Sequence, residues 1–476
     1  MTGKERFEQH LKRHPHAHRP VAAKPHLSRR MFFQLAGSGL LCSYLPDRAL
    51  AQSAPRITTN YEVTPINRAK NVIFILLTGA PSHTDTFDFK QSVDSPLDLL
   101  KPDTVNGIAW PFGILPNLGQ ATKEFTIVRS VRAWALVHSL AQTWSQIGRS
   151  PAGVLGDVAP NIGSVVALEK AGERGADQVF PTFLALNSDS GVGSGYFSSS
   201  YAPFRVTPAA AGIRNTSNPS DPNGTGRFAE RWALLRNLDG SLRRDGALGK
   251  GPSDMDAFYE SAKGMMYNPA VNEAFSFTAE KSARYGSTGF GNACLVASQV
   301  LAANQGTRFV QISYGSWDHH VGIYTPMEND QGRAKLPGMA KTLDDGLSAL
   351  LADLKASGAL DETLIVMTGE FGRTVGALTS SAGRDHHVQQ FAFFAGAGVV
   401  GGRVIGATDA TGAAVVESGW SRQREIRPED IEATIYSAMG INWTTVRYDD
   451  PFGRGFYYVP DSDSDVYGPI NELWAS

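Results

Sequence analysis

Six histidines follow residue 51, and all of them lie in four short polar segments that contain His83, His138, His319 with His320, and His386 with His387. Carboxylates accompany three of these segments, at Asp85 and Asp88, at Asp318 and at Asp385. Imidazole and carboxylate are ligand types that hold divalent cations, and imidazole also carries protons near neutral pH. The combination predicts a metal-dependent site.

The first segment follows the apolar run at residues 71–77 and contains the sequence from Gly79 to Asp88. Ligand sites in open α/β sheets lie beyond the carboxyl ends of the strands, so Asp85 is a candidate metal ligand. The alternative for Asp85 or Asp88 is a capping role at the following turn, which is common for Asp in loops.

The second segment follows the apolar run at residues 125–131, and a helical pattern begins at His138 and Ser139. Backbone N–H groups and the helix dipole favour an anion at this position. A Ser139 hydroxyl there could attack a phosphorus or sulfur centre, although an N-cap role explains this serine equally well. His138 is a candidate metal ligand or acid/base group.

The third segment, residues 315–320, follows a strand that ends near residue 314. If the segment stays extended, Asp318 and His320 point to one side and His319 to the other. A single metal would therefore take Asp318 and His320.

The fourth region has two parts, residues 368–374 and residues 383–387. An apolar strand delivers Glu370 between two glycines, and we predict Glu370 and His386 as metal ligands. Arg373 is a candidate clamp for an anionic substrate, with structural pairing to Glu370 or Asp385 as the alternative.

Apolar runs that alternate with helical patterns must position these segments. The runs lie at residues 71–77, 125–131, 183–186, 308–312, 363–367 and 391–395, and the helical patterns at 161–171, 228–242, 254–267 and 339–357. This alternation predicts a three-layer α/β/α sandwich with a mostly parallel sheet over residues 71–446. We expect a loop insertion around residues 188–226, often a sign of an active-site loop, and a wrapping tail at residues 447–476.

The N-terminus has the three parts of a twin-arginine signal peptide over residues 1–51, with a linker at 52–70. Arg29 and Arg30 precede an apolar run at residues 32–45, and Ala49-Leu50-Ala51 resembles a cleavage site. The run is too short for a permanent membrane anchor, so we expect a periplasmic or secreted protein that uses the twin-arginine export machinery.

The remainder of the chain is acidic and has one cysteine. The first 51 residues carry nine basic and three acidic side chains, which leaves 35 basic against 43 acidic side chains and a net charge of about −8. This charge argues against a nucleic-acid partner. Cys294 alone cannot form a disulfide within one chain.

Together the segments at 79–88, 137–142, 317–320, 369–374 and 383–386 resemble a largely uncharacterised bacterial family of twin-arginine-exported proteins in the alkaline phosphatase and sulfatase superfamily. The resemblance covers residues 71–409 and implies an alkaline phosphatase-like fold. It also implies one or two divalent metals, zinc or calcium or another ion, and a nucleophile near Ser139. Phe371 replaces a metal-binding histidine of the superfamily, and no Cys-x-Pro-x-Arg sequence for a sulfatase formylglycine is present.

The resemblance implies metal-assisted hydrolysis of a phosphate or sulfate ester, with a small anionic ester or glycan-type substrate. The nucleophile would be Ser139 or a water molecule activated by the metal. The alternative is a non-catalytic periplasmic binding or accessory protein that holds a structural or vestigial metal. A weaker third option is a mutase or phosphonate-type activity, which the same fold supports.

Overall fold

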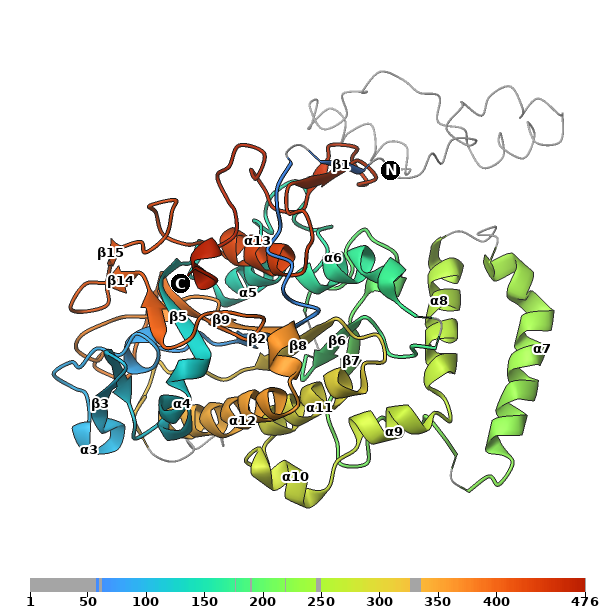
Figure 1. The fold of residues 1–476 in the computed structure, drawn as a ribbon, viewed down its shortest axis with the longest axis horizontal. Coiled ribbons are helices and arrows are strands. Elements are labelled where there is room, and N and C mark those ends of the chain that lie inside the picture. Colours follow the sequence, from blue (N-terminus) through green and yellow to red (C-terminus); the bar gives the residue numbers. More distant parts are fainter. Residues whose placement is uncertain are drawn as a thin grey trace, which may run out of the picture. The chain divides into compact units, whose positions relative to one another are not determined.

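The apolar runs of the sequence form the strands of a central sheet in a computed structural model of the chain (Figure 1). The structure describes residues 57–59, 62–175, 177–188, 191–218, 220–244, 250–325 and 335–475. The predicted signal peptide, residues 1–51, lies outside the described residues. The eight-stranded sheet has the order β13 (Arg403–Ile405), β5 (Phe125–Arg132), β12 (Gln389–Ala395), β9 (Thr363–Gly369), β2 (Asn71–Leu77), β8 (Phe309–Tyr314), β6 (Phe183–Leu186) and β7 (Phe204–Val206).

The sheet is mostly parallel, as predicted, but β12 runs against both of its neighbours. β12 pairs antiparallel with β5 and with β9, whereas the other adjacent strands of this sheet pair in parallel. The N-terminal end of β12 therefore lies at the edge where the parallel strands have their carboxyl ends. Residues just before β12 consequently reach the same edge as residues that follow the parallel strands.

Alternate residues of β2 enter two separate hydrophobic cores, because successive side chains of a strand point to opposite faces. Ile73, Ile75 and Leu77 lie in one core, and Val72, Phe74 and Leu76 lie in the other. Every residue of this strand is buried, which explains its unbroken apolar sequence. The three-layer α/β/α prediction is confirmed by this arrangement.

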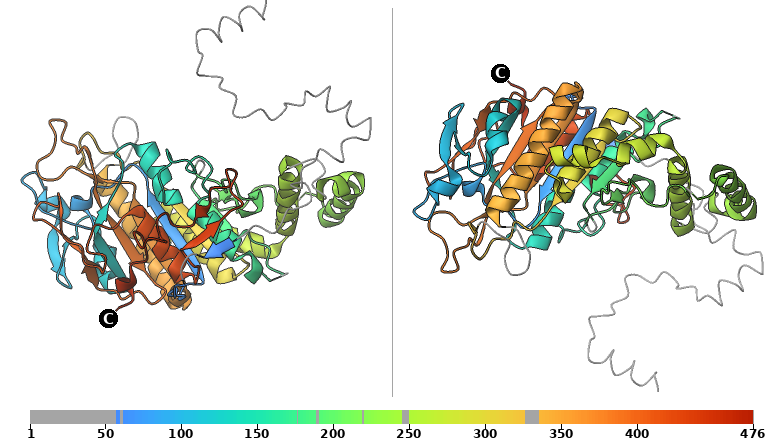
Figure 2. Two further views of the ribbon diagram at one scale, coloured as in Figure 1. Left: turned by 90° about the horizontal axis from the view of Figure 1, so that it is seen from above. Right: turned by 90° about the horizontal axis from the view of Figure 1, so that it is seen from below.

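Each core is covered by its own set of helices. The core around Ile73 includes residues of α4 (Pro116–Gln120), α9 (Pro269–Phe275), α11 (Gly289–Ala303) and α12 (Leu336–Ala356). Seen from below in Figure 2, α12 and α11 lie across this face of the sheet. The core around Val72 includes residues of α5 (His138–Ile147), α6 (Ile162–Glu169) and α13 (Pro428–Ala438). The helical patterns predicted at 161–171 and 339–357 correspond to α6 and α12.

The other described helices and strands contribute few or no residues to the two cores. Two long helices, α7 (Gly224–Arg244) and α8 (Lys250–Met265), lie side by side beyond the β7 edge of the sheet (Figure 1). Two other short helices are α3 (Leu97–Leu100) and α10 (Ala279–Arg284). Three small antiparallel sheets have two strands each: β3 (Pro102–Val105) with β4 (Ile108–Pro111), β10 (Gly372–Arg373) with β11 (His386–His387), and β14 (Ala407–Thr408) with β15 (Val415–Glu417). A fourth has three strands in the order β1 (Ile57–Thr59), β16 (Thr445–Arg447) and β17 (Phe456–Tyr457).

The two irregular zones of the sequence take part in the fold. The zone at residues 188–226 contains β7, which extends the central sheet by pairing in parallel with β6. The tail at 447–476 contains β17, and its Trp474 donates a hydrogen bond to the carbonyl of Ala397. Among the described helices, none combines the length and the apolar character needed to cross a membrane.

Candidate metal centre

Four polar side chains from three distant parts of the chain meet at the edge where the parallel strands end. His138 is the first residue of α5, which follows β5, and Asp318 and His320 lie in the loop after β8. His386 lies in β11, just before β12, and reaches this edge because β12 is antiparallel. The close approach of the loop after β2 to the loop after β8 needs a glycine, since a Cβ on Gly79 would come within 2.6 Å of the backbone nitrogen of Trp317.

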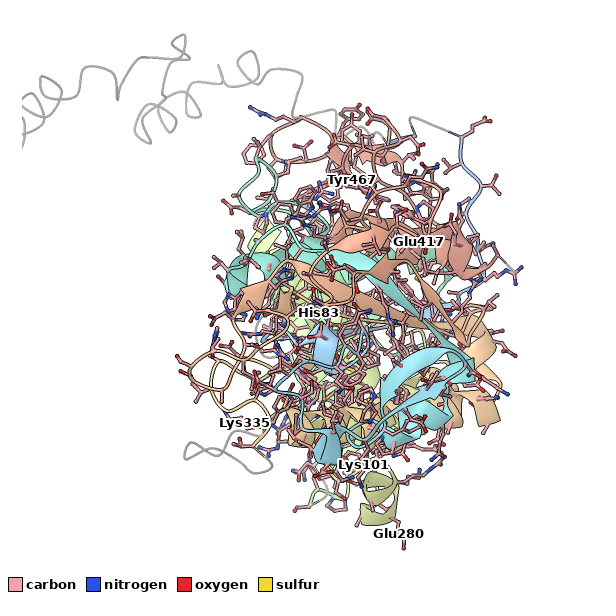
Figure 3. All side chains as sticks on the ribbon, turned by 90° about the vertical axis from the view of Figure 1, so that its left-hand side faces the viewer. His83, Lys101, Glu280, Lys335, Glu417 and Tyr467 are labelled. Atoms are coloured by element: carbon pink, nitrogen blue, oxygen red, sulfur yellow. The ribbon has the colours of Figure 1, made fainter. Side chains whose placement is uncertain are left out.

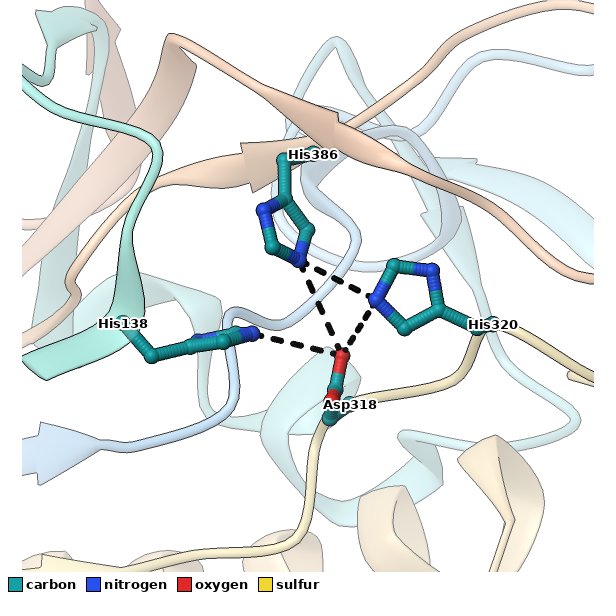
Figure 4. A group of neighbouring side chains, drawn as sticks. All are labelled: His138, Asp318, His320 and His386. Atoms are coloured by element: carbon teal, nitrogen blue, oxygen red, sulfur yellow. Dashed lines mark hydrogen bonds and ion pairs between the residues drawn. The ribbon is translucent and has the colours of Figure 1, made fainter.

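The ligand atoms of His138, Asp318, His320 and His386 all lie within 4.8 Å of one another (Figure 4). Asp318 Oδ1 is 2.9 Å from His320 Nε2, 3.5 Å from His138 Nε2 and 4.0 Å from His386 Nε2. The Nε2 atoms of His320 and His386 are 3.1 Å apart. Tetrahedral zinc with bonds of about 2.0–2.1 Å separates its ligand atoms by about 3.3 Å, so these four residues fit one metal ion.

The Nδ1 atom of each histidine in the group faces a hydrogen-bond acceptor. The contacts are His138 Nδ1 to Glu370 Oε1 at 2.7 Å, His320 Nδ1 to Asp385 Oδ1 at 2.9 Å, and His386 Nδ1 to the carbonyl oxygen of Leu136 at 2.7 Å. Carboxylate and carbonyl oxygens only accept, so the proton of each neutral imidazole belongs on Nδ1. The three Nε2 lone pairs therefore point into the group, as they do in metal sites whose histidines are oriented by outer partners.

The sequence analysis predicted Glu370 as a metal ligand, but this residue is not one of the four and contacts the group through His138. Its Oε1 accepts hydrogen bonds from His138 Nδ1, from Gln142 Nε2 at 3.1 Å and from the Gly79 amide at 2.9 Å. The side chain is fully buried, and its Oε2 atom has no hydrogen-bond partner. In this structure Glu370 contacts the centre through His138.

Asp85, also predicted as a ligand, is not a member of the group of four and has other partners. It is fully buried and lies 2.7 Å from Arg384 Nε through Oδ2. Its Oδ1 accepts from Tyr324 Oη at 2.6 Å and from Arg384 Nη2 at 3.2 Å. A buried carboxylate needs a compensating charge, and here Arg384 supplies it.

Arg373 is fully buried and makes a structural contact with Asp318 in place of the predicted pairing with Glu370 or Asp385. Its Nη2 donates to Asp318 Oδ1 at 2.5 Å and to the Gly79 carbonyl, and its Nε donates to the Ala80 carbonyl at 2.8 Å. Its Nη1 donates to the Arg384 carbonyl and to His320 Nε2, both at 3.2 Å. A guanidinium has five N–H groups, and these contacts use all of them in this structure, although the one to His320 Nε2 would be lost if that nitrogen bound a metal. Arg373 is thus held mainly by Asp318 and by backbone carbonyls, and its predicted role as an anion clamp stays a prediction.

The charges around the centre shift the pKa values of its members. The hydrogen bond to Glu370 raises the pKa of His138 above its ordinary value, whereas burial lowers the pKa of His386. Burial alone would raise the pKa of Asp318, but the hydrogen bond and charge of Arg373 lower it overall. Asp318 is therefore a carboxylate at neutral pH, as a metal ligand must be.

Ser139, the predicted nucleophile, follows His138 on the first turn of α5 and is exposed. The N-cap of α5 is Val137, so the alternative capping role of Ser139 does not apply. Phe371 is fully buried, and its ring centroid lies 4.9 Å from that of His138 and 4.6 Å from that of His386. This phenylalanine forms an apolar wall behind two of the histidines.

The remaining histidines of the sequence clusters lie outside the group. His83 (Figure 3) is buried, and its Nε2 atom is 2.8 Å from the Gly412 carbonyl oxygen. His387 accepts a hydrogen bond from the Gln389 amide, and His319 is buried. The sequence analysis did not predict Asp385, Gln142 or the Leu136 carbonyl as hydrogen-bond partners of this group; it named Asp385 only as a nearby carboxylate and a possible partner of Arg373. Its contact with His320 joins residues 65 positions apart, which the sequence alone does not show.

A family model described as "Protein of unknown function (DUF1501)" matches residues 69–462. No protein with curated annotation matches the chain. Solved structures that are similar include the phosphonate monoester hydrolase SpPMH from Silicibacter pomeroyi, with 12% identity, coverage of 86% of this chain and 77% of that chain, and a TM-score of 0.42. The PsFucS1 sulfatase from Pseudoalteromonas sp. has 12% identity, coverage of 80% of this chain and 68% of that chain, and a TM-score of 0.37. A protein in the alkaline phosphatase superfamily from Vibrio parahaemolyticus has 13% identity, the same two coverages and a TM-score of 0.34.

Proposed function

The chain belongs to the family described as "Protein of unknown function (DUF1501)", and we propose that it is an exported, metal-dependent hydrolase of phosphate or sulfate esters. The metal would be held by His138, Asp318, His320 and His386. The observation that carries the proposal is the convergence of three Nε2 atoms and one carboxylate oxygen, each imidazole being held through Nδ1 by an acceptor.

The donor set favours a particular class of metal. Three imidazoles and one carboxylate suit zinc and other first-row transition metals, whereas calcium takes six to eight oxygen ligands. Asp318 supplies the one oxygen ligand of the group. We therefore propose zinc or a similar transition metal, and we do not propose calcium.

The protein residues would have distinct tasks in ester hydrolysis. A divalent ion in this site would supply Lewis-acid polarisation of the ester oxygen and would lower the pKa of a nucleophile. Glu370 orients His138, Asp385 orients His320, and Arg373 holds Asp318 in place. Ser139 is the proposed nucleophile because its exposed hydroxyl follows His138 directly, with a water molecule as the alternative.

One observation favours a second candidate function, that of a non-catalytic accessory protein with a structural metal. Four of the five N–H groups of Arg373 are engaged by Asp318 and by backbone carbonyls, which leaves at most one for the anionic group of an ester. Enzymes that act on phosphate or sulfate esters commonly use such a clamp.

Metal analysis combined with ester assays separates the two functions. We expect the full chain to retain about one transition-metal ion per molecule. We also expect it to hydrolyse at least one of p-nitrophenyl phosphate, bis-p-nitrophenyl phosphate and p-nitrophenyl sulfate. His386→Ala should lose both metal and turnover, while the adjacent control His387→Ala should keep both, because His387 lies outside the group.

Bound metal without turnover on any of the three esters would favour the accessory function. Full turnover by His386→Ala, or wild-type protein that binds no transition metal, would overturn the proposed metal-dependent activity.

A further inference from the structure

Asp85 and Arg384 form a buried ion pair, and Arg384 lies two residues before His386 of the metal centre. Neither side chain has any exposed surface, and Arg384 Nε is 2.7 Å from Asp85 Oδ2 while Nη2 is 3.2 Å from Oδ1. Two parallel N–H···O contacts of this kind fix the relative orientation of the two planar groups. The pair therefore joins the loop after β2 rigidly to the segment before β11.

Arg384 connects three segments, two of which carry members of the metal centre. Its backbone amide donates to the His319 carbonyl at 3.0 Å, and its carbonyl accepts from Arg373. Its Nη1 donates to the carbonyls of Thr374 at 2.8 Å and of Gly376 at 3.1 Å. The residue that follows in sequence, Asp385, accepts from His320.

The loop around Arg384 packs directly on the backbone of His320. A Cβ on Gly383 would lie 2.0 Å from the His320 carbonyl oxygen, so only glycine permits this approach. The amide of Ile323 donates to the Ala382 carbonyl at 2.9 Å. Tyr324, in the same segment as His320, donates its hydroxyl proton to Asp85 Oδ1. The pair thus contacts the segment of Asp318 and His320 through Tyr324, and Arg384 itself belongs to the segment of His386.

We propose that Asp85 is a positioning residue of the metal centre, which acts through Arg384 and Tyr324 to hold the segment of Asp318 and His320 against the segment of Asp385 and His386. The inference rests on the metal centre of the proposed function but not on the ester substrate. Its physical basis is that a metal binds more tightly to ligands that surrounding residues already hold in place.

The experiment measures transition-metal affinity by competition with a chromophoric chelator, using zinc and the full chain. Asp85→Asn keeps the size of the side chain but removes its charge, and we expect zinc affinity to fall about tenfold or more. Tyr324→Phe keeps the ion pair and removes one hydrogen bond, so we expect a smaller loss, about twofold to threefold. This milder variant keeps the test informative if Asp85→Asn does not fold.

A matched control is available in the buried pair of Asp430 and Arg424. Arg424 donates to the two carboxylate oxygens of Asp430 at 2.7 and 2.8 Å, and the Asp430 side chain is fully buried. None of the residues bonded to Asp430 is a member of the metal centre. Asp430→Asn should lower the melting temperature of the metal-free protein and leave zinc affinity within about twofold of the wild type.

The cobalt-substituted protein gives a second readout. The visible spectrum of bound Co²⁺ reports ligand geometry, so Asp85→Asn should change it and Asp430→Asn should not. Equal zinc affinities for Asp85→Asn and wild type, or equal losses in Asp85→Asn and Asp430→Asn, would overturn the positioning role. Tight zinc binding without ester turnover would overturn the hydrolase proposal and leave the positioning role standing.

Discussion

Replacing Glu370 with glutamine tests whether this carboxylate orients a ligand or is itself a ligand. Glu370 Oε1 is 2.7 Å from His138 Nδ1 and also accepts from Gln142 and from the Gly79 amide. In Glu370→Gln the amide oxygen can still accept these bonds, but the bond to His138 is no longer charge-assisted. Hydrogen bonds to charged partners are about twice as strong as neutral ones.

The expected loss of zinc affinity follows from the position of the lost charge, next to a proposed metal ligand. Removal of an outer partner of a metal-bound histidine weakens metal binding about 10-fold to 100-fold, or roughly 1.4–2.7 kcal/mol. The new amide N–H groups would occupy the position of Oε2, a buried atom without a hydrogen-bond partner. A buried unsatisfied amide costs about 1–3 kcal/mol of stability, so Glu370→Gln should also unfold more easily.

The assay is a zinc competition titration that reports both affinity and stoichiometry. At saturating zinc we expect Glu370→Gln to bind as many ions as the wild type, but more weakly. Gln142→Ala is the control, because it removes another partner of the same carboxylate and does not touch His138. Unchanged affinity in Glu370→Gln would refute the orienting role, and the loss of an entire ion would show that Glu370 is a ligand.

Three further predictions concern the rest of the chain. Burial raises the pKa of Glu432 to about 8, so the folded state keeps a proton that the unfolded state loses near pH 4.5. The free energy of unfolding should therefore fall by up to about 5 kcal/mol as pH rises from 4.5 to 8. Denaturant titrations at pH 5 and 8.5 should show this loss in the wild type and not in Glu432→Gln. Burial lowers the pKa of His83 to about 4, so the free energy of unfolding should fall by up to about 3 kcal/mol as pH drops from 6.5 to 4. Denaturant titrations over this pH range should show the loss in the wild type and not in His83→Gln. Replacing Arg29 and Arg30 with lysine should leave the protein in the cytoplasm, and its recovery in the periplasmic fraction would contradict twin-arginine export.

The apolar strands were predictable because strands buried on both faces have no room for polar side chains. The run at residues 71–77 forms β2 with the predicted bounds, and the run at 183–186 forms β6. The short edge strand β7 was not predicted, since all three of its residues are only partly buried and its sequence resembles that of a loop.

The candidate ligands were predictable in part. Asp318, His320 and His386 were proposed as ligands from residue type and from their position at strand ends, and the structure brings them together with His138. Asp85 and Glu370 met the same criteria but have other partners. A sequence does not reveal that Arg384 lies against Asp85 or that His138 lies between Glu370 and the centre, because these contacts join residues about 230 to 300 positions apart.

By itself, the sequence determined the α/β class, the strands that form most of the sheet and the residue types available for a metal. These properties follow from local patterns of apolar and polar side chains. Only the tertiary structure decided which carboxylate joins the histidines, because the antiparallel direction of β12 brings His386 to the shared edge and Arg373 pairs with Asp318 there. Which side chains share a metal depends on the packing of distant segments, and local patterns do not encode that packing.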